Sequence, residues 1–143
     1  MTLKLVRSLK LLKGNFDMKI ATLIARLLLG LMFLVLGLNG FLGFLNMGPA
    51  PTGLAGQFMA ALFVSHYYWV IAGLQVIGGA LLLVNRFVPL ALVLLGPVIA
   101  NILLYHIFLN HAGAAFAAVV TVLVLIVFYA KRQYFSGLLV HRT

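Results

Sequence analysis

Four long apolar stretches, separated by short breaks, limit how this chain can fold more than any other feature. They cover residues 20–45, 67–84, 87–109 and 112–129. An α-helix needs about 20 apolar residues to cross a hydrocarbon core about 30 Å thick, and each stretch is close to or above that length. Only 8% of the 143 residues are charged, against about 25% in soluble domains, so charged side chains could not cover a soluble surface. The sequence therefore predicts an all-α fold, an integral membrane four-helix bundle in one domain.

A fifth, shorter helix is predicted between the first two spans, at the outer membrane interface. The run Gly-Pro-Ala-Pro at residues 48–51 ends the first helix, because proline lacks the N–H that a helix needs. Residues 52–65 are uncharged and too short to span, and Thr52 stands where a helix cap is favoured. The side of this helix that we expect to be buried carries Phe58, Leu62 and Phe63. A cluster of aromatic residues at 66–69 follows, as is typical of a membrane interface.

Residues 1–17 form an N-terminal arm of different composition, which precedes the four-span domain of residues 18–143. Its cationic residues recur every three positions among leucines, and they are Lys4, Arg7, Lys10 and Lys13. This pattern predicts a short basic amphipathic helix that lies on the anionic head groups of the cytoplasmic leaflet. Because Met18 could itself be a start, the alternative is that the arm is an upstream extension.

The distribution of cations predicts the orientation of the chain. The connections at residues 46–66 and 110–111 hold no Lys or Arg, whereas residues 1–19, the turn at residues 85–86 and the tail after residue 130 hold nine. These nine are Lys4, Arg7, Lys10, Lys13, Lys19, Arg86, Lys131, Arg132 and Arg142. Cytoplasmic connections are rich in Lys and Arg, so both termini are expected in the cytoplasm, in a bacterial-type cytoplasmic (inner) membrane. The net charge of +9 then faces lipid head groups, and nucleic acid is not an expected partner.

Two residue types that are missing or rare exclude several kinds of chemistry. The chain has no cysteine, which excludes disulfides, thiol redox chemistry, thiolate metal sites and c-type haem attachment. Its only acidic side chain is Asp17, before the first span. No carboxylate is therefore available within the spans as a proton relay or a cation ligand.

Polar side chains within the spans are the first candidates for a functional site, because each costs free energy to place in a bilayer. Arg26 lies two turns into the first span. It could snorkel to the inner interface, or it could be an interior cation that pairs with Gln75, Asn101 or a bound anion. For Gln75 and Asn101, hydrogen bonds between helices are the favoured role. These three residues are candidate ligand-binding residues.

A second polar group is expected near the outer face. Tyr68, Tyr105 and His106 are candidates to hold a quinone head group, although no cofactor is evident from the sequence. The weaker candidates for a metal or haem iron are His66, His106 and His111. No metal is expected, because His106 and His111 are five residues apart instead of the four that place two ligands on one helical face. Interfacial histidines are more often plain anchors, and His141 in the tail is uninformative.

Four segments resemble the DoxX family of small four-helix membrane proteins. They are residues 25–31 (ARLLLGL), 78–83 (GGALLL), 85–91 (NRFVPLA) and 101–106 (NILLYH), and the resemblance extends over residues 19–131. The family includes relatives of the small subunit of a thiosulfate:quinone oxidoreductase, and most members have no established activity. Many members carry a glutamate near the position of Gln75. The resemblance therefore implies a four-helix fold and a link to membrane redox complexes, with any proton-coupled role in doubt.

Three functions follow as hypotheses. The first is an accessory subunit of a quinone-linked membrane redox system. The second is a non-catalytic scaffold or assembly partner, as a homo-oligomer or a subunit, that works through its glycine-lined helix faces. The third is a transporter of a small anion or a lipid, suggested by Arg26 as an interior cation. Whether the chain is an enzyme is left open.

Overall fold

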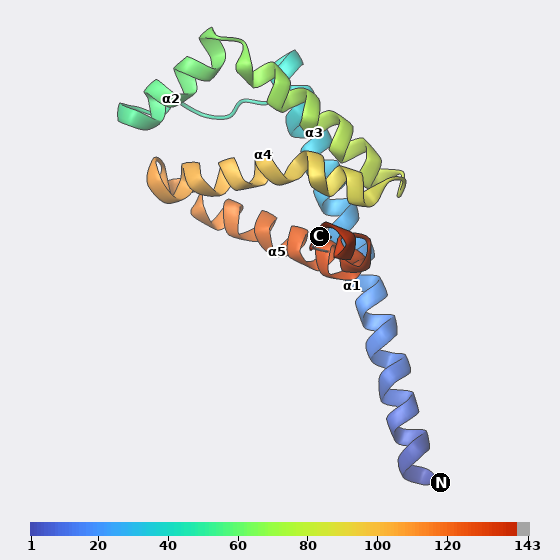
Figure 1. Ribbon diagram of the computed structural model, residues 1–143. Coiled ribbons are helices and arrows are strands. Elements are labelled where there is room, and N and C mark those ends of the chain that lie inside the picture. The colour runs from blue at the N-terminus through green and yellow to red at the C-terminus, as the bar shows by residue number, and fades with distance from the viewer. Residues whose placement is uncertain (140–143) are drawn as a thin grey trace.

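The computed structural model describes residues 1–139, and the regular elements in that range are all helices (Figure 1). They are α1 (Thr2–Leu42), α2 (Gly53–Val64), α3 (Tyr67–Leu83), α4 (Val88–Phe108) and α5 (Ala114–Lys131). Three short 3-10 turns, His111–Gly113, Arg132–Tyr134 and Ser136–Leu139, flank α5. The all-α prediction is confirmed for this range. Arg142 and His141 lie outside the described residues.

Three helical segments are long and apolar enough to cross a membrane, namely Thr2–Leu42, Val88–Phe108 and His111–Tyr134. The predicted second span corresponds to α3, which has 17 residues and rises only about 26 Å at 1.5 Å per residue. Together with α2, from which it is bent by 83°, α3 passes the same test as one broken span. A fourth crossing therefore depends on the α2–α3 pair.

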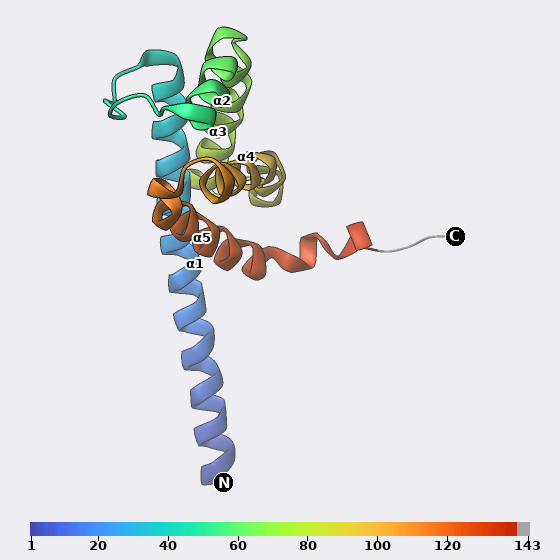
Figure 2. The ribbon, with the colours of Figure 1, turned by 90° about the vertical axis from the view of Figure 1, so that its left-hand side faces the viewer.

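The helices fan out instead of running parallel. In Figure 1, α1 is nearly upright, α4 and α5 lie almost across the view, and α3 takes an intermediate direction. In the view turned by 90°, α1 is again upright and α4 is seen almost end-on (Figure 2). The four-helix membrane bundle expected from the sequence is therefore not confirmed. Hydrophobic patterns predict which residues are helical, but crossing angles depend on how the side chains of two helices interlock.

The arm and the first span form one continuous helix of 41 residues, so the arm is helical as predicted but continues into the first span without a break. Residues 2–20 of α1 are exposed, and the N-terminal part of this helix extends away from the other helices (Figures 1 and 2). No proline interrupts the segment, and leucine and lysine favour helix. The helix ends at Leu42, three residues earlier than predicted, because Gly43 adopts a left-handed conformation (φ 61°) and its N–H bonds the Asn39 carbonyl.

The short helix between the first two spans is confirmed as α2, although two details differ from the prediction. Thr52 precedes α2, but its side chain makes no capping hydrogen bond. Phe58 and Leu62 are half-buried, as expected of an inner face, whereas Phe63 is 49% exposed. Ala55 is the residue of α2 that is buried.

The core lies where α1, α3, α4 and α5 meet. Its most deeply buried large side chains are Leu29, Phe33, Leu82, Leu95, Val120 and Val127. Glycines allow α1 and α3 to approach closely: a Cβ atom placed on Gly37 would lie 2.7 Å from the Ala72 carbonyl oxygen. Small residues at such contacts are typical of helix pairs in membranes.

Candidate functional site

The inner candidate site begins at the end of α3, where Arg26 of α1 meets the last carbonyl groups of that helix. The Arg26 side chain is 8% exposed, and its Nη1 donates hydrogen bonds to the carbonyl oxygens of Leu82 and Leu83, the latter at 3.2 Å. The last carbonyl groups of a helix have no partner within it and carry the negative end of its dipole. The buried guanidinium therefore satisfies two acceptors and opposes their partial charge.

The turn after α3 supplies the remaining donors. Asn85 has a left-handed backbone (φ 55°), which asparagine tolerates better than most residues. Its N–H donates to the Leu82 carbonyl at 3.3 Å, and the N–H of Arg86 donates to the Leu81 carbonyl at 3.1 Å. These two bonds form a Schellman motif. Every carbonyl from Leu81 to Leu83 thus has a donor, and the Arg26 side chain provides two of the hydrogen bonds.

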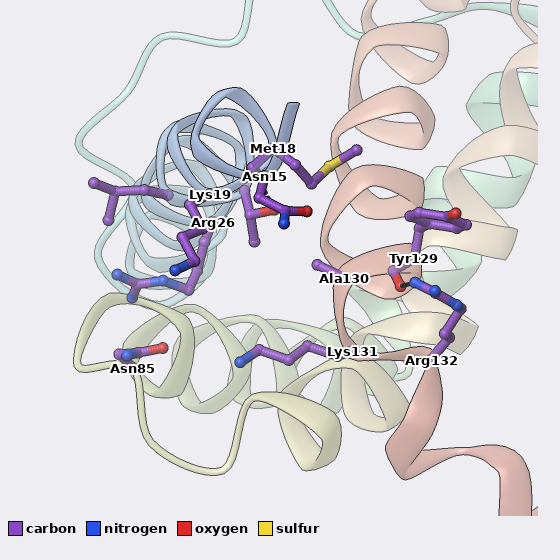
Figure 3. Close-up of a pocket in the computed structure, with 11 residues that line it drawn as sticks. Asn15, Met18, Lys19, Arg26, Asn85, Tyr129, Ala130, Lys131 and Arg132 are labelled. Carbon is purple, nitrogen blue, oxygen red and sulfur yellow. Dashed lines mark hydrogen bonds between the residues drawn. The ribbon is translucent and has the colours of Figure 1, made fainter. Parts of the chain in front are cut away.

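An open pocket of about 490 Å³ lies beside this capped helix end, between α1, the α3–α4 turn and the end of α5 (Figure 3). Its cationic lining residues are Lys19, Arg26, Lys131 and Arg132. In Figure 3 the side chains of Arg26 and Lys131 and the amide of Asn85 are directed into the same space. The pocket is therefore strongly basic, although only Arg26 of its lining residues was a predicted site residue.

Arg26 does not pair with Gln75 or Asn101. Gln75 is half-buried in α3, and Asn101 is exposed on α4. Neither side chain makes a hydrogen bond within residues 1–139, so the expected polar bridge between these helices is not formed there. The physical reason for Asn101 is its angle on the helix. The buried stripe of α4 includes Leu95 and Ile99, and Asn101 is rotated well away from it.

The outer candidate site is assembled by α2, which stacks on both neighbouring helices. The ring of Phe58 lies 5.9 Å from that of Tyr105 in α4, and the ring of Phe63 lies 4.4 Å from that of Tyr68 in α3. His106 contacts Tyr105 edge to face at 5.1 Å. Tyr68 and Tyr105, predicted to lie near the same face, are thus both held against the short helix.

His106 is held in a defined orientation. Its Nδ1 lies 2.9 Å from the carbonyl oxygen of Asn110. A carbonyl oxygen only accepts hydrogen bonds, so Nδ1 carries the proton and, in the neutral ring, Nε2 presents a lone pair. The ring also covers Gly113, where a Cβ atom would lie 2.0 Å from the His106 ring. The contact requires glycine at that position.

His66 has a structural role at the corner between α2 and α3. Its backbone is left-handed (φ 59°), and its N–H donates to the Phe63 carbonyl at 3.1 Å. Its ring packs on Trp69, with centroids 5.1 Å apart. Histidine is among the residues found more often than average in this conformation. His66 therefore forms the bend of 83° between the two helices.

We expect His66→Gly to preserve or raise stability and His66→Val to lower it by about 1–2 kcal/mol, since a β-branched residue is strained at positive φ. Unfolding in detergent micelles, followed by circular dichroism, measures both variants. A glycine variant less stable than the valine variant would show that the corner depends on the imidazole ring and not on the backbone conformation.

The three histidines proposed as weak metal candidates do not gather. Within residues 1–139, no group of three or more His, Cys, Asp or Glu side chains could hold a metal ion. His111 is exposed at the start of the turn before α5, and His66 is at the α2–α3 corner. His106 alone is tied to its surroundings by a hydrogen bond of its ring.

Sequence reasoning missed most of the basic pocket. In the sequence, Lys19, Lys131 and Arg132 indicate orientation, and Asn85 belongs to a segment that resembles the DoxX family. Lys19 and Arg26 are seven residues apart, which places both on one face of a helix. This spacing was a usable signal on α1. Nothing in the sequence indicates that the end of α5 faces the same space.

Comparisons with protein-family models, curated proteins and solved structures find no match to this chain.

Proposed function

We propose that this chain is a four-span membrane protein of the DoxX type and an accessory subunit of a quinone-linked redox system. The α2–α3 pair counts as one broken span, the membrane is a bacterial-type cytoplasmic membrane, and both termini are cytoplasmic. Three helical segments that are apolar enough to cross support the membrane assignment. The orientation is supported by Lys and Arg at one end of the spans.

The observation that carries the redox proposal is the group formed by Phe58, Tyr105 and His106. A quinone head group is a flat ring with two carbonyl oxygens, and its reduced form carries two hydroxyl groups. Aromatic rings pack favourably on such a ring, and the Tyr105 hydroxyl can donate to a carbonyl oxygen. The free lone pair on Nε2 of His106 suits a quinol hydroxyl, because it can accept that proton.

The residues of this chain then bind and orient the head group and hold one proton. Phe58 would cover one face of the ring, Tyr105 would hold an oxygen, and Nε2 of His106 would accept a proton on quinol oxidation. The bond from Nδ1 to the Asn110 carbonyl holds the ring in the orientation that this role needs. Electron transfer to or from the head group is the task of the partner subunit.

The single tryptophan of the chain gives a direct test. Trp69 lies 6.2 Å from Tyr68, ring to ring, at the same end of the fold. We expect a short-chain ubiquinone analogue to quench Trp69 fluorescence saturably in detergent micelles. Tyr105→Phe removes one hydroxyl and keeps the ring, and we expect about tenfold weaker binding, as is usual for one lost hydrogen bond.

Matched controls separate binding from general quenching. Gly113→Ala moves the His106 ring and is expected to weaken binding in the same direction as Tyr105→Phe. Tyr134→Phe, an exposed tyrosine beyond the end of α5, should leave binding unchanged. Linear quenching without saturation, or equal affinity in Tyr105→Phe and Tyr134→Phe, would contradict the quinone proposal.

A scaffold role is the second candidate, and it is favoured by a surface other than the glycine faces. Gly37 of α1 faces the Ala72 carbonyl of α3, so that glycine face is already occupied within the chain. On the exposed arm, Leu5, Leu9 and Leu12 recur at the four- and three-residue spacing of paired helices. Co-purification from native membranes with and without residues 2–17 tests this role, which predicts loss of a bound partner on deletion.

The transporter hypothesis remains the third candidate, and its motive is Arg26 as an interior cation. Arg26 donates two hydrogen bonds to the end of α3, so part of its capacity to hold an anion is already used.

A further inference from the structure

We propose that the basic pocket between α1, the α3–α4 turn and the end of α5 binds a phosphate group, and that this group belongs to an anionic phospholipid. The pocket adjoins the α3–α4 turn (Figure 3), whereas Tyr105 lies near the other end of α4. It is therefore a site separate from the proposed quinone site.

The first argument is the sign and density of charge. Lys19 and Arg26 reach the pocket from one face of α1, and Lys131 reaches it from the end of α5. Asp17 is the only acidic side chain of the chain and does not line the pocket. Cations gathered from two helices without a carboxylate among them repel one another, and a bound anion relieves that repulsion. Arg and Lys are the side chains that most often bind phosphate.

The second argument is that several hydrogen-bond donors of the Arg26 guanidinium are unused. Its Nη1 is engaged by the carbonyl oxygens of Leu82 and Leu83. The guanidinium has five N–H groups, so three remain on Nε and Nη2. They make no hydrogen bond within residues 1–139, and no side-chain nitrogen in that range is buried without a partner. These N–H groups are therefore accessible from the pocket. The Nη1 group of the same side chain is fixed by its two hydrogen bonds to α3.

The third argument identifies a lipid as the source of the phosphate. The basic rim adjoins apolar lining residues, namely Met18, Leu23, Tyr129 and Ala130, which suit a glycerol backbone and the start of an acyl chain. Arg132 lies over the Tyr129 ring at 4.1 Å and donates to its carbonyl oxygen, so it forms a fixed wall. Basic pockets between helices on the cytoplasmic side commonly hold anionic head groups. The lipid source rests on the proposed membrane placement, whereas the phosphate chemistry does not.

Native mass spectrometry of the full chain in detergent micelles tests the site. Phosphatidylglycerol is titrated against phosphatidylcholine, whose head group has no net charge. We expect one phosphatidylglycerol bound at least fivefold more tightly than phosphatidylcholine. The double variant Lys19→Met, Lys131→Met should weaken phosphatidylglycerol binding about tenfold. The control is Lys10→Met, Lys13→Met, which removes the same charge from the exposed arm and should have little effect.

A competition measurement distinguishes a lipid phosphate from a soluble phosphate as the ligand. If inorganic phosphate and glycerol 3-phosphate at millimolar concentration leave the lipid bound, the site is a lipid site, as proposed. If both compete fully and their binding is lost in Lys19→Met, Lys131→Met, the phosphate site stands and its ligand is soluble. Equal effects of the pocket and arm variants, or no preference over phosphatidylcholine, would overturn the proposal. None of these outcomes depends on quinone binding.

Discussion

Replacing Gly79 with alanine is expected to lower the free energy of unfolding by about 1–3 kcal/mol, although alanine is the better helix former. A Cβ atom at Gly79 would lie 2.5 Å from the backbone nitrogen of Leu34 and 2.7 Å from the carbonyl oxygen of Gly30. Both are backbone atoms of α1 and cannot rotate away as a side chain would. The two helices must therefore move apart and lose contact along their length. Unfolding in mixed micelles of increasing denaturant content, followed by circular dichroism, measures the change.

The matched control is Gly73→Ala in the same helix. A Cβ atom at Gly73 would meet no atom of residues 1–139 within 4 Å beyond its own turn of helix, so this change should stabilise the protein by about 0.5–1 kcal/mol through helix propensity alone. We expect the free energy of unfolding to fall in Gly79→Ala and to rise in Gly73→Ala. Equal stability of both would show that α1 and α3 are not in backbone contact at Gly79.

Replacing Arg26 with methionine is expected to cost about 2–4 kcal/mol of stability. Methionine fills similar space but donates no hydrogen bond. The Leu83 carbonyl then loses its Arg26 donor, the Leu82 carbonyl keeps only the N–H of Asn85, and the end of α3 loses a neighbouring positive charge. Hydrogen exchange of the amides at the end of α3 should show the loss directly, together with the unfolding free energy.

Two further variants separate the hydrogen bonds from the charge. Arg86→Met removes a cation from an exposed position of the same turn and is expected to change stability by less than about 0.5 kcal/mol. Arg26→Lys keeps the charge with a differently shaped donor and should recover part of the loss. If Arg86→Met costs as much as Arg26→Met, net charge near the turn explains the effect and the capping role of Arg26 is wrong.

Most helix positions could be predicted, because each depends on a local pattern of apolar residues and breakers. Both α3 and α4 begin within one residue of the predicted positions, residues 67 and 87. The errors lie at the ends. Gly43 turns left-handed and ends α1 early, and a 3-10 turn at His111–Gly113 delays the start of α5 by two residues. The arm joined the first span because nothing in residues 1–20 breaks a helix.

The candidate site could be predicted only in part. Arg26 stood out because a charge within an apolar span is costly. Its partners could not be identified, since they are backbone carbonyl groups, which every residue carries. The outer residues Tyr105 and His106 were expected near the interface, but their contacts with Phe58 and Gly113 depend on how α2 and α5 fold back.

The sequence alone determined that the described chain is helical, largely apolar and basic at one end of its helices, because hydropathy and charge are properties of each segment by itself. Only the tertiary structure decided that the helices fan out and that Arg26 caps α3. It also decided that Lys19 and Lys131 share a pocket. These features depend on close approach at single glycines such as Gly79, where one added carbon would separate two helices.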